Sequence, residues 1–415
     1  MRILVLGSGA REHAIVNALL REAAEHEIIA APGNAGIAAV ATTVALDPTD
    51  PAVVADTVID NGIELVVIGP EAPLVAGVAD ALRTRGIPVF GPGRAAAALE
   101  GSKAFAKRIM ESAGVPTGRS LRASTLQDAE AALDELGPPY VVKADGLAAG
   151  KGVIVTTDRD AAVAHAAYWL HHGDVLVEEH LEGEEVSLFF LSDGTHVLPL
   201  SPAQDFKRAY DGDEGPNTGG MGAYSPLPWL PEGFIDDVMD DIALPTVRQL
   251  ADEQTPFIGL LYCGLVLTED GPKVIEFNAR FGDPETQVVL ERLKTPLSRL
   301  LFAAATGQLG GVPRPEFTDD VAVTVVLASE GYPDSPVTGR PIAGLDEVRD
   351  VSIAHAATAR NADGGFVATG GRVLSVVATA PDFEGARAKA YAALETIRLE
   401  GGHYRRDIAE KVVGR

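Results

Sequence analysis

The sequence predicts a multidomain protein of α/β and α+β type, and three observations lead to this fold class. The chain has 415 residues, which is too long for one ordinary hydrophobic core. Over about the first 100 residues, short apolar runs alternate with amphipathic stretches, as in a parallel sheet with crossover helices. Beyond residue 312, β-rich runs precede a closing helical segment. We therefore expect domains at 1–101, 102–311 and 312–415.

The first domain contains four apolar runs of strand length, each followed by a loop rich in glycine or proline. In open α/β sheets ligands bind beyond the carboxyl ends of the strands, so these loops are candidate binding segments. The expected strands are Arg2–Leu6, Glu27–Ala31, Glu64–Ile68 and Pro88–Phe90.

The middle domain is predicted to contain a smaller α+β lobe at about 120–190. Ser124 and Gln127 have the spacing of a capping box for a helix that ends at Gly137. The stretch 205–228 has no clear periodicity, and loops of this length inside a compact domain are commonly functional. A helix is expected near 285–308.

Composition and charge exclude several classes of function. The net charge of −25 repels a nucleic-acid backbone, so neither DNA nor RNA is the expected partner. The longest apolar runs fall far short of the roughly 20 residues that cross a bilayer. The single Cys263 cannot form an internal disulfide, and no export signal is recognisable at the N-terminus. We expect a cytoplasmic protein without a membrane partner.

The segment 143–152 has the composition of a phosphate-binding loop. Lys143 stands at a predicted strand end and is followed by Gly146, Gly150 and Gly152. Glycines allow backbone N–H groups to approach phosphate oxygens, and lysine supplies a point charge. The segment is not a Walker A loop, because no Gly-Lys-Ser/Thr opens a helix. An ordinary β-hairpin turn is the alternative interpretation.

The segment 273–280 predicts a site for a hard cation. Side chains alternate along a strand, so Glu276 and Asn278 share one face while Ile275 and Phe277 point to the other. A carboxylate and an amide oxygen suit Mg²⁺ that bridges nucleotide phosphates. Arg280 continues the same face. The alternative is a half-exposed strand with solvated polar residues.

Two weaker patterns leave their interpretation open. The run 175–181 fits an edge strand that offers backbone groups to an adenine, or a strand with a charged end. Gly7-Ser8-Gly9 is half of a dinucleotide fingerprint, but Glu12 stands where a third glycine is expected. An NAD-dependent dehydrogenase would also leave the lysine loop and the Glu276 segment unexplained. His13 is expected to be a packed helix residue.

The phrases GSGAREHA, APGNAG, VIGPEAPL, LEGSKAFAK, VKADGLAAGKGV, GPNTGGMGAYSP and VIEFNARFGDPETQ follow one another along almost the whole chain. Together they closely resemble the phosphoribosylamine–glycine ligase family, the glycinamide ribonucleotide synthetases of the ATP-grasp superfamily. The resemblance implies a Rossmann-like pre-ATP-grasp domain, an ATP-grasp fold and a small C-terminal α+β domain. It also implies a carbon–nitrogen ligase of purine biosynthesis that forms ADP.

The resemblance further implies roles for individual residues. Asp205 and Arg280 are the expected catalytic residues, and Glu276 and Asn278 the ligands of Mg²⁺ or Mn²⁺. For phosphoribosylamine we expect Asn34 and Glu71, and for glycine Met221 together with the two catalytic residues. The expected ATP-binding residues are Lys103, Lys143, Gly146, Gly150, Gly152, Glu178, Glu179, Leu181 and Glu185.

Three points remain open at this level. Many ATP-grasp enzymes have another carboxylate on the strand before the metal ligands, but 262–268 contains none, so the number of metal ions is undetermined. Another ATP-grasp ligase of purine synthesis and a nucleotide-binding regulator without catalysis are alternative functions. We expect a monomer that uses glycine, 5-phosphoribosylamine and ATP.

Overall fold

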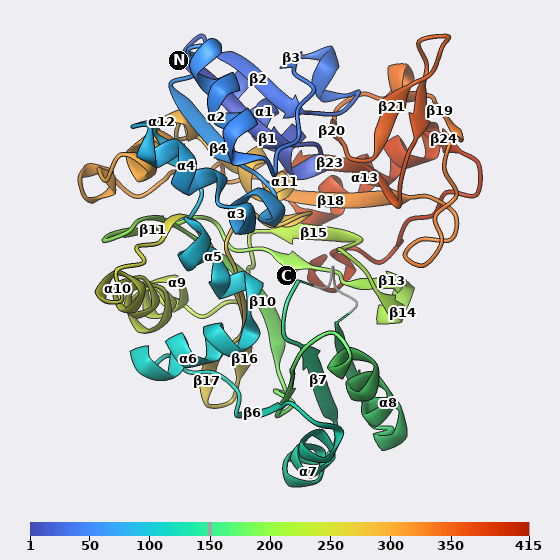
Figure 1. Ribbon diagram of the computed structural model, residues 1–415. Coiled ribbons are helices and arrows are strands. Elements are labelled where there is room, and N and C mark those ends of the chain that lie inside the picture. Colours follow the sequence, from blue (N-terminus) through green and yellow to red (C-terminus); the bar gives the residue numbers. More distant parts are fainter. Residues whose placement is uncertain (148–151, 415) are drawn as a thin grey trace.

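A computed structural model describes residues 1–147 and 152–414 (Figure 1). The N-terminal region forms a parallel sheet in the order β3-β2-β1-β4-β5. Its strands are β1 (Arg2–Gly7), β2 (Glu27–Pro32), β3 (Thr42–Thr43), β4 (Leu65–Ile68) and β5 (Val89–Phe90). Both faces of the sheet are buried, which explains why β1 and β4 are apolar at nearly every position.

Helices cover this sheet on its two sides. Alternate residues of β1 enter different cores: Leu4 packs with residues of α2 and α4, and Val5 packs with residues of α1. The helices of this region are α1 (Ala10–Leu20), α2 (Pro51–Asp60), α3 (Glu71–Ala76), α4 (Val78–Thr84) and α5 (Arg94–Gly101).

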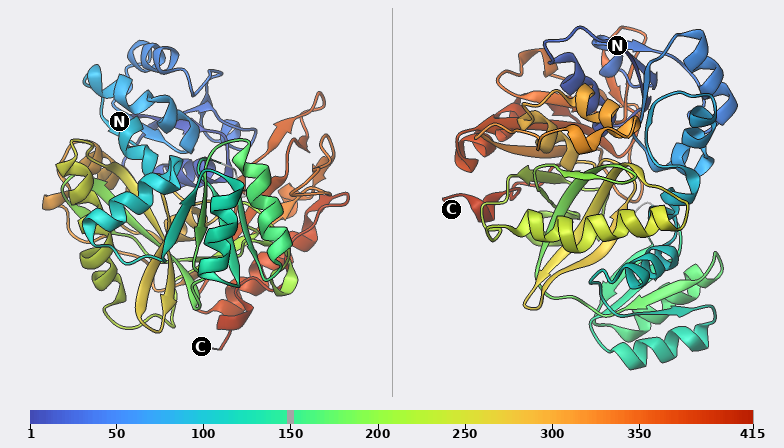
Figure 2. Two further views of the ribbon diagram at one scale, coloured as in Figure 1. Left: turned by 60° about the horizontal axis from the view of Figure 1, so that its bottom comes forward. Right: turned by 90° about the vertical axis from the view of Figure 1, so that its left-hand side faces the viewer.

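A small lobe projects from the body of the molecule (Figure 2). Its antiparallel sheet has the order β6-β9-β7-β8, and α7 and α8 share a separate apolar core with it. The elements are β6 (Ser120–Ala123), α7 (Leu126–Leu136), β7 (Tyr140–Ala144), β8 (Val153–Thr156), α8 (Arg159–Leu170) and β9 (Val175–Glu178).

The predicted capping box of α7 is wrong by one residue. Thr125, not Ser124, is the N-cap; its hydroxyl accepts from the Asp128 N–H while the Asp128 carboxylate accepts from the Thr125 N–H. Both pairs have the same three-residue spacing, and only the extended backbone at Thr125 distinguishes them.

The central antiparallel sheet has the order β11-β10-β16-β17. Its strands are β10 (Glu184–Asp193), β11 (Val197–Pro199), β16 (Ile258–Thr268) and β17 (Gly271–Asn278). One face packs Cys263 and Phe277 against α6 (Lys103–Ala113) and α10 (Leu244–Asp252). Tyr262 lies on the other face, opposite Asn278. This second face forms the floor of the candidate site.

The C-terminal sheet, in the order β12-β15-β18-β23-β20, includes strands from the middle of the chain. The strands β12 (Gln204–Asp205) and β15 (Gly222–Ser225) pair on to β18 (Val321–Ala328), β23 (Arg372–Ala380) and β20 (Ser352–His355). The stretch 205–228 is therefore not wholly irregular, because it also holds β13 (Arg208–Tyr210) and β14 (Glu214–Asn217). Its many glycines concealed these short strands. Helix α13 (Phe383–Thr396) packs on this sheet.

The helix expected at 285–308 is two helices. They are α11 (Glu285–Arg292) and α12 (Leu297–Ala305), and Pro296 separates them because proline lacks an N–H donor and restricts the preceding residue. In the residues that the structure describes, no helix is both long and apolar enough to cross a membrane.

Candidate active site

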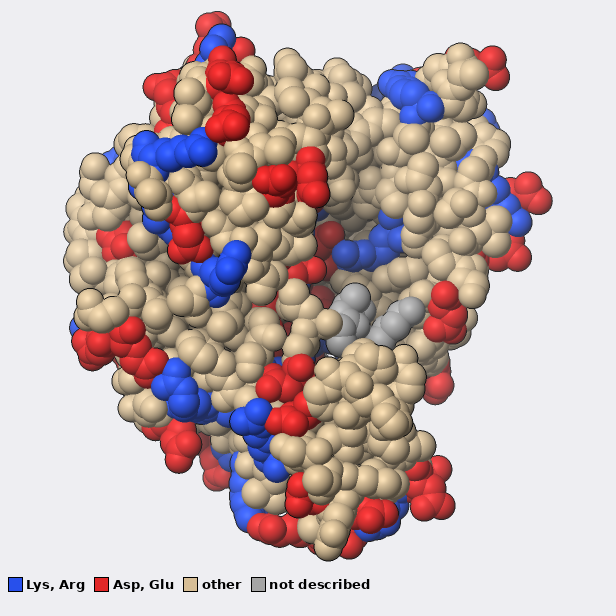
Figure 3. Space-filling model, in the orientation of Figure 1, with Lys and Arg blue, Asp and Glu red and all other residues tan. Residues whose placement is uncertain are grey.

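The candidate site lies where the floor of the central sheet meets the small lobe and the N-terminal region. Figure 3 shows a hollow on this side of the molecule with basic and acidic side chains on its walls. Lysines from α6 and β7 approach it from one side, and Arg280 approaches it from the end of β17. Gly150 lies outside the described residues.

The lysines form a cluster around one buried carboxylate. The Nζ atom of Lys143 is 3.0 Å from the Oε2 atom of Glu178, and the Nζ atom of Lys107 is 3.2 Å from the same oxygen. The Nζ atom of Lys103 donates to the carbonyl of Gly146 at 3.2 Å. Burial lowers the pKa of Lys103 and Lys107, and the charge of Lys143 adds to this effect, while nearby carboxylates oppose it. An anionic ligand would relieve the repulsion among these cations.

Lys107 was not among the predicted site residues. It lies one helical turn after Lys103 on α6, and residues four apart share a helix face. That spacing was the available signal.

The carboxylate of Glu178 points toward Lys143 and Lys107. Its neighbour Glu179 donates its backbone N–H to the carbonyl of Arg119. A Cβ atom at Gly118 would lie 3.3 Å from Glu179 and 3.6 Å from Leu181, so this segment packs closely on Gly118. These contacts fix the position of the segment that connects β9 to β10.

Glu276 and Asn278 share one face of β17 as predicted, but Ile275 does not join Phe277 in the core: a register shift between Gly264 and Leu265 places Val274 there instead. Burial alone would raise the pKa of Glu276, but Lys207, Lys143, Lys103 and Arg280 lower it. On β16, Gly264 faces Glu276, and a Cβ atom there would lie 2.9 Å from its Cγ atom. Glycine at this position therefore leaves space for the carboxylate.

The oxygen atoms of Glu276 and Asn278 have the chemistry that Mg²⁺ or Mn²⁺ requires. Among the described residues, no group of three or more His, Cys, Asp or Glu side chains could hold a metal ion. The donor set thus fits a cation that takes its remaining ligands from phosphate and water.

Arg280 is held between two carboxylates from the N-terminal region. Its Nη2 atom is 3.0 Å from Glu100, and its Nε atom is 3.3 Å from Glu71. Glu100 also accepts the N–H of Ala279 at 2.8 Å, so it fixes both the backbone and the side chain at the end of β17. Burial raises the pKa of Glu100. In the case of Glu71, which is 38% exposed, burial acts in the same direction, but the charges of Arg280 and Arg11 and the hydrogen bonds of the carboxylate together lower its pKa.

Asp205 lies beside Lys207 and two further carboxylates. The Nζ atom of Lys207 forms an ion pair with Glu185 and is 3.9 Å from Asp205. Burial raises the pKa of Asp205 to about 7; Glu285, Glu185 and Glu276 add to the shift, while Lys207 opposes it. Neither Lys207 nor Glu285 was predicted, although Glu285 lies in the quoted phrase VIEFNARFGDPETQ.

The side chains of Asn34 and Met221 are already engaged within the protein. Asn34 donates to the carbonyls of Ser8 and His355 and accepts from the N–H groups of Gly36 and Ile37. Met221 is completely buried. Asn34 therefore braces loops around the expected phosphoribosylamine site.

His13 is packed, as expected. Its Nδ1 atom accepts the backbone N–H of His355 at 2.9 Å, and the ring centroids are 5.6 Å apart. Burial lowers the pKa of His13 to about 3 and that of His355 to about 4. Two neutral histidines thus join α1 to β20.

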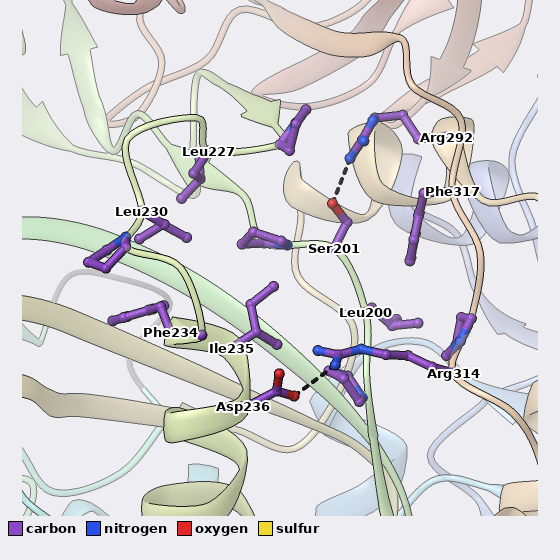
Figure 4. Close-up of a pocket in the computed structure, with 16 residues that line it drawn as sticks. Leu200, Ser201, Leu227, Leu230, Phe234, Ile235, Asp236, Arg292, Arg314 and Phe317 are labelled. Carbon is purple, nitrogen blue, oxygen red and sulfur yellow. Dashed lines mark hydrogen bonds and ion pairs between the residues drawn. The ribbon is translucent and has the colours of Figure 1, made fainter.

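A second cavity, of about 400 Å³, lies apart from these residues (Figure 4). Leu227, Leu230 and Phe234 give it apolar walls. Arg292 reaches it while donating to Ser201, and an ion pair between Arg314 and Asp236 borders it.

Comparison with known families decides the relationship of the whole chain. Models described as phosphoribosylglycinamide synthetase match it in three consecutive parts: the N domain at 1–100, the ATP-grasp (A) domain at 101–286 and the C domain at 322–411. The chain belongs to the phosphoribosylglycinamide synthetase family. The family and fold class predicted from the sequence are confirmed.

Similarity to individual members of this synthetase family extends over the full length. The chain is 72% identical to the phosphoribosylamine–glycine ligase of Leifsonia xyli, over 99% of this chain and 100% of that one. It is 56% identical to the ligase of Streptomyces coelicolor, over 100% of both. The crystal structure of the Thermotoga maritima ligase superposes with a TM-score of 0.86 at 34% identity, covering 99% and 100% of the two chains.

Proposed function

We propose that this protein joins glycine to 5-phosphoribosylamine with conversion of ATP to ADP and phosphate. The product is glycinamide ribonucleotide, a precursor in purine biosynthesis. The observation that carries the proposal is the 72% identity to a phosphoribosylamine–glycine ligase along the whole chain. The paired lysines and the Glu276–Asn278 pair support it, because a nucleotide-binding regulator without catalysis would not need both.

ATP is proposed to lie between the small lobe and the central sheet. Lys103 and Lys143 bind its phosphates with the N–H groups of Gly146 and Gly152, and the segment at Glu179 and Leu181 contacts the adenine. Glu185 accepts the ribose hydroxyls. The strand β9 is not the edge strand that the sequence suggested, because β6 and β7 pair with it on its two sides. The Glu178 carboxylate is paired with lysines, so we assign this residue the positioning of Lys143.

Glu276 and Asn278 would hold one divalent cation, Mg²⁺ or Mn²⁺. Such an ion neutralises phosphate charge and orients the phosphate chain when it is bound. The cations around Glu276 keep the carboxylate ionised, so that its oxygens stay available as ligands.

The chemistry proceeds in two displacement steps. A carboxylate oxygen of glycine attacks the γ-phosphorus, the bond to the ADP oxygen breaks, and glycyl phosphate forms. The amine of phosphoribosylamine then attacks the carbonyl carbon, phosphate leaves with the shared oxygen, and the nitrogen loses a proton. Lys103, Lys143 and Arg280 are placed to neutralise charge, and positioning supplies much of the rate.

Substrate binding is proposed to divide between two neighbouring regions. Glu71 and the loop braced by Asn34 bind phosphoribosylamine. Asp205, Arg280 and the loop of Met221 bind glycine and its activated form. We also propose that the enzyme acts as a monomer, and the soluble substrates support a cytoplasmic location.

An isotope experiment tests the function and the reaction order together. ADP release should require both glycine and freshly prepared phosphoribosylamine. With glycine labelled by oxygen-18 in its carboxylate, each released phosphate should carry one labelled oxygen. Unlabelled phosphate during normal product formation would exclude the acyl-phosphate route. Absence of release with both substrates present would refute the proposed function.

A further inference from the structure

Glu285 is a buried carboxylate that forms no ion pair with a described residue, although its charge interacts with that of Arg280. It is 4% exposed and begins α11. Its Oε1 atom accepts from the hydroxyl of Tyr262 at 2.9 Å and lies 3.5 Å from the hydroxyl of Ser187. Within the described residues, Oε2 accepts no hydrogen bond, and no Lys, Arg or His side chain forms an ion pair with Glu285. Burying a carboxylate in this way is costly unless a cation joins it.

The partners of Glu285 place it at the floor of the candidate site. Tyr262 lies opposite Asn278, and Ser187 lies opposite Gly264, which in turn faces Glu276. Paired residues of an antiparallel sheet point to the same side. Glu285 therefore contacts the same face that carries the proposed metal ligands.

Local backbone geometry provides the space for this carboxylate. A Cβ atom at residue 282 would lie 2.6 Å from the Oε2 atom of Glu285 and 3.2 Å from the ring of Tyr262. Gly282 thus lets the carboxylate pack against the tyrosine. A larger residue there would displace it.

Asp205 approaches the same place from a neighbouring segment. The bridge between Ser187 and Ala203 sets Asp205, two residues further on, beside β10. The side chain of Asp205 is 8% exposed, and the charge of Glu285 contributes to the upward shift of its pKa. Two buried carboxylates therefore lie near one another.

The other acidic residues at the floor already have cations. Glu185 is paired with Lys207, and four basic side chains surround Glu276. Glu285 differs from both, because its nearest polar partners are hydroxyl groups. A cationic ligand would supply the ion pair that Glu285 lacks among the described residues.

We propose that Glu285, together with Asp205, binds the ammonium group of glycine; this rests on the proposed function. The ammonium group is joined to the carboxylate carbon through one methylene, so it must lie close to the atoms that react. When the carboxylate of glycine lies at the phosphate-binding side of the floor, its ammonium group lies toward Glu285. An acid that lacks the amine makes no ion pair with the two carboxylates, so the site would bind it more weakly than glycine.

The test compares Glu285→Gln with the wild-type enzyme, because glutamine keeps the shape and removes the charge. We expect the KM for glycine to rise about 10- to 100-fold, as for loss of a hydrogen bond between charged groups. The inhibition constant of acetate, measured against glycine, should change less than about threefold, because acetate has no ammonium group. Asp205→Asn should show the same pattern. Glu291→Gln on the same helix, where the carboxylate contacts Arg21 and Ser352, is the matched control.

Two outcomes would overturn the assignment. In one, the KM for glycine is unchanged in an active Glu285→Gln enzyme. In the other, the KM for glycine and the inhibition constant of acetate rise by the same factor, which indicates general damage to the pocket. The ratio of the two constants does not depend on the amount of folded enzyme, so reduced stability cannot imitate the expected result. Failure of the wild-type enzyme to release ADP with glycine would refute the proposed function instead.

Discussion

Acidification should destabilise the protein through the contact between His13 and His355. Both rings are buried and neutral in the folded state, since burial lowers their pKa to about 3 and about 4 from an ordinary value of 6.5. Unfolding exposes them to water, where they bind protons below about pH 6.5. The unfolded state therefore binds more protons, and stability falls as the pH drops below that value.

The size of the effect follows from the two pKa values. At about pH 5 an exposed histidine lies about 1.5 units below its pKa, and each unit corresponds to about 1.4 kcal/mol. Each neutral ring thus loses about 2 kcal/mol of its contribution to stability relative to about pH 7.5, and the pair about 4 kcal/mol. Most of the loss should occur between about pH 6.5 and the folded-state values near 3 and 4.

The experiment measures urea unfolding by circular dichroism at about pH 7.5 and about pH 5. His13→Gln keeps a hydrogen-bond acceptor for the N–H of His355 but does not titrate. Its free energy of unfolding should fall by about 2 kcal/mol less than that of the wild type between the two conditions. His172→Gln, at an exposed helix end, is the control and should behave as the wild type.

A variant His13→Gln that loses as much stability on acidification as the wild type would refute the reasoning. It would mean that His13 is accessible to protons in the folded state. A greater loss in His13→Gln than in the wild type would reverse the sign and exclude a neutral buried pair.

The remaining predictions concern the charged groups of the candidate site. Glu276→Gln should lower kcat at least about 100-fold at saturating Mg²⁺, measured as ADP release, because it removes the charged ligand among four cations. Lys143→Met should raise the KM for ATP about tenfold or more while changing that for glycine little, since Lys143 is proposed to bind the phosphates of ATP. Glu100→Gln should lower stability in urea unfolding by about 2 kcal/mol and reduce kcat more than it changes either KM, because Arg280 loses one of its two ion pairs with the N-terminal region.

A different experimental result would contradict each of these predictions. Near-normal turnover of Glu276→Gln would exclude it as a metal ligand. A change confined to the KM for glycine would exclude Lys143 as a phosphate contact; Lys389→Met, at an exposed position, serves as its control. Wild-type stability and kcat in Glu100→Gln would show that Arg280 does not depend on it.

Local pattern was enough to predict elements whose residues are close in sequence. The buried runs of β1 and β4 follow from continuous apolarity, and the shared face of Glu276 and Asn278 follows from the two-residue period of a strand. A three-residue spacing did not distinguish Ser124 from Thr125 as the cap of α7. Here the backbone conformation decided between equal patterns.

Contacts between distant segments could not be predicted in this way. Glu100 reaches Arg280, and His355 reaches His13, because the N-terminal region packs against the central and C-terminal sheets. No spacing in the chain encodes these distances. Glu285 was missed for another reason: its proposed role depends on the absence of an ion pair among the described residues. Such an absence is visible only after the surroundings are known.

The pairing of charges explains how an acidic chain can bind an anionic nucleotide. The net charge of −25 opposes ATP at long range, yet Lys143 and Lys107 lie beside Glu178, and Arg280 lies between Glu100 and Glu71. These carboxylates hold the cations in fixed positions before the ligand arrives, so little reorganisation is required on binding. The same pairing lowers the attraction of each cation for phosphate. We therefore expect ATP to contact several of them together, which would favour a triphosphate over a single phosphate group and make the arrangement of the cluster, rather than its total charge, the basis of recognition.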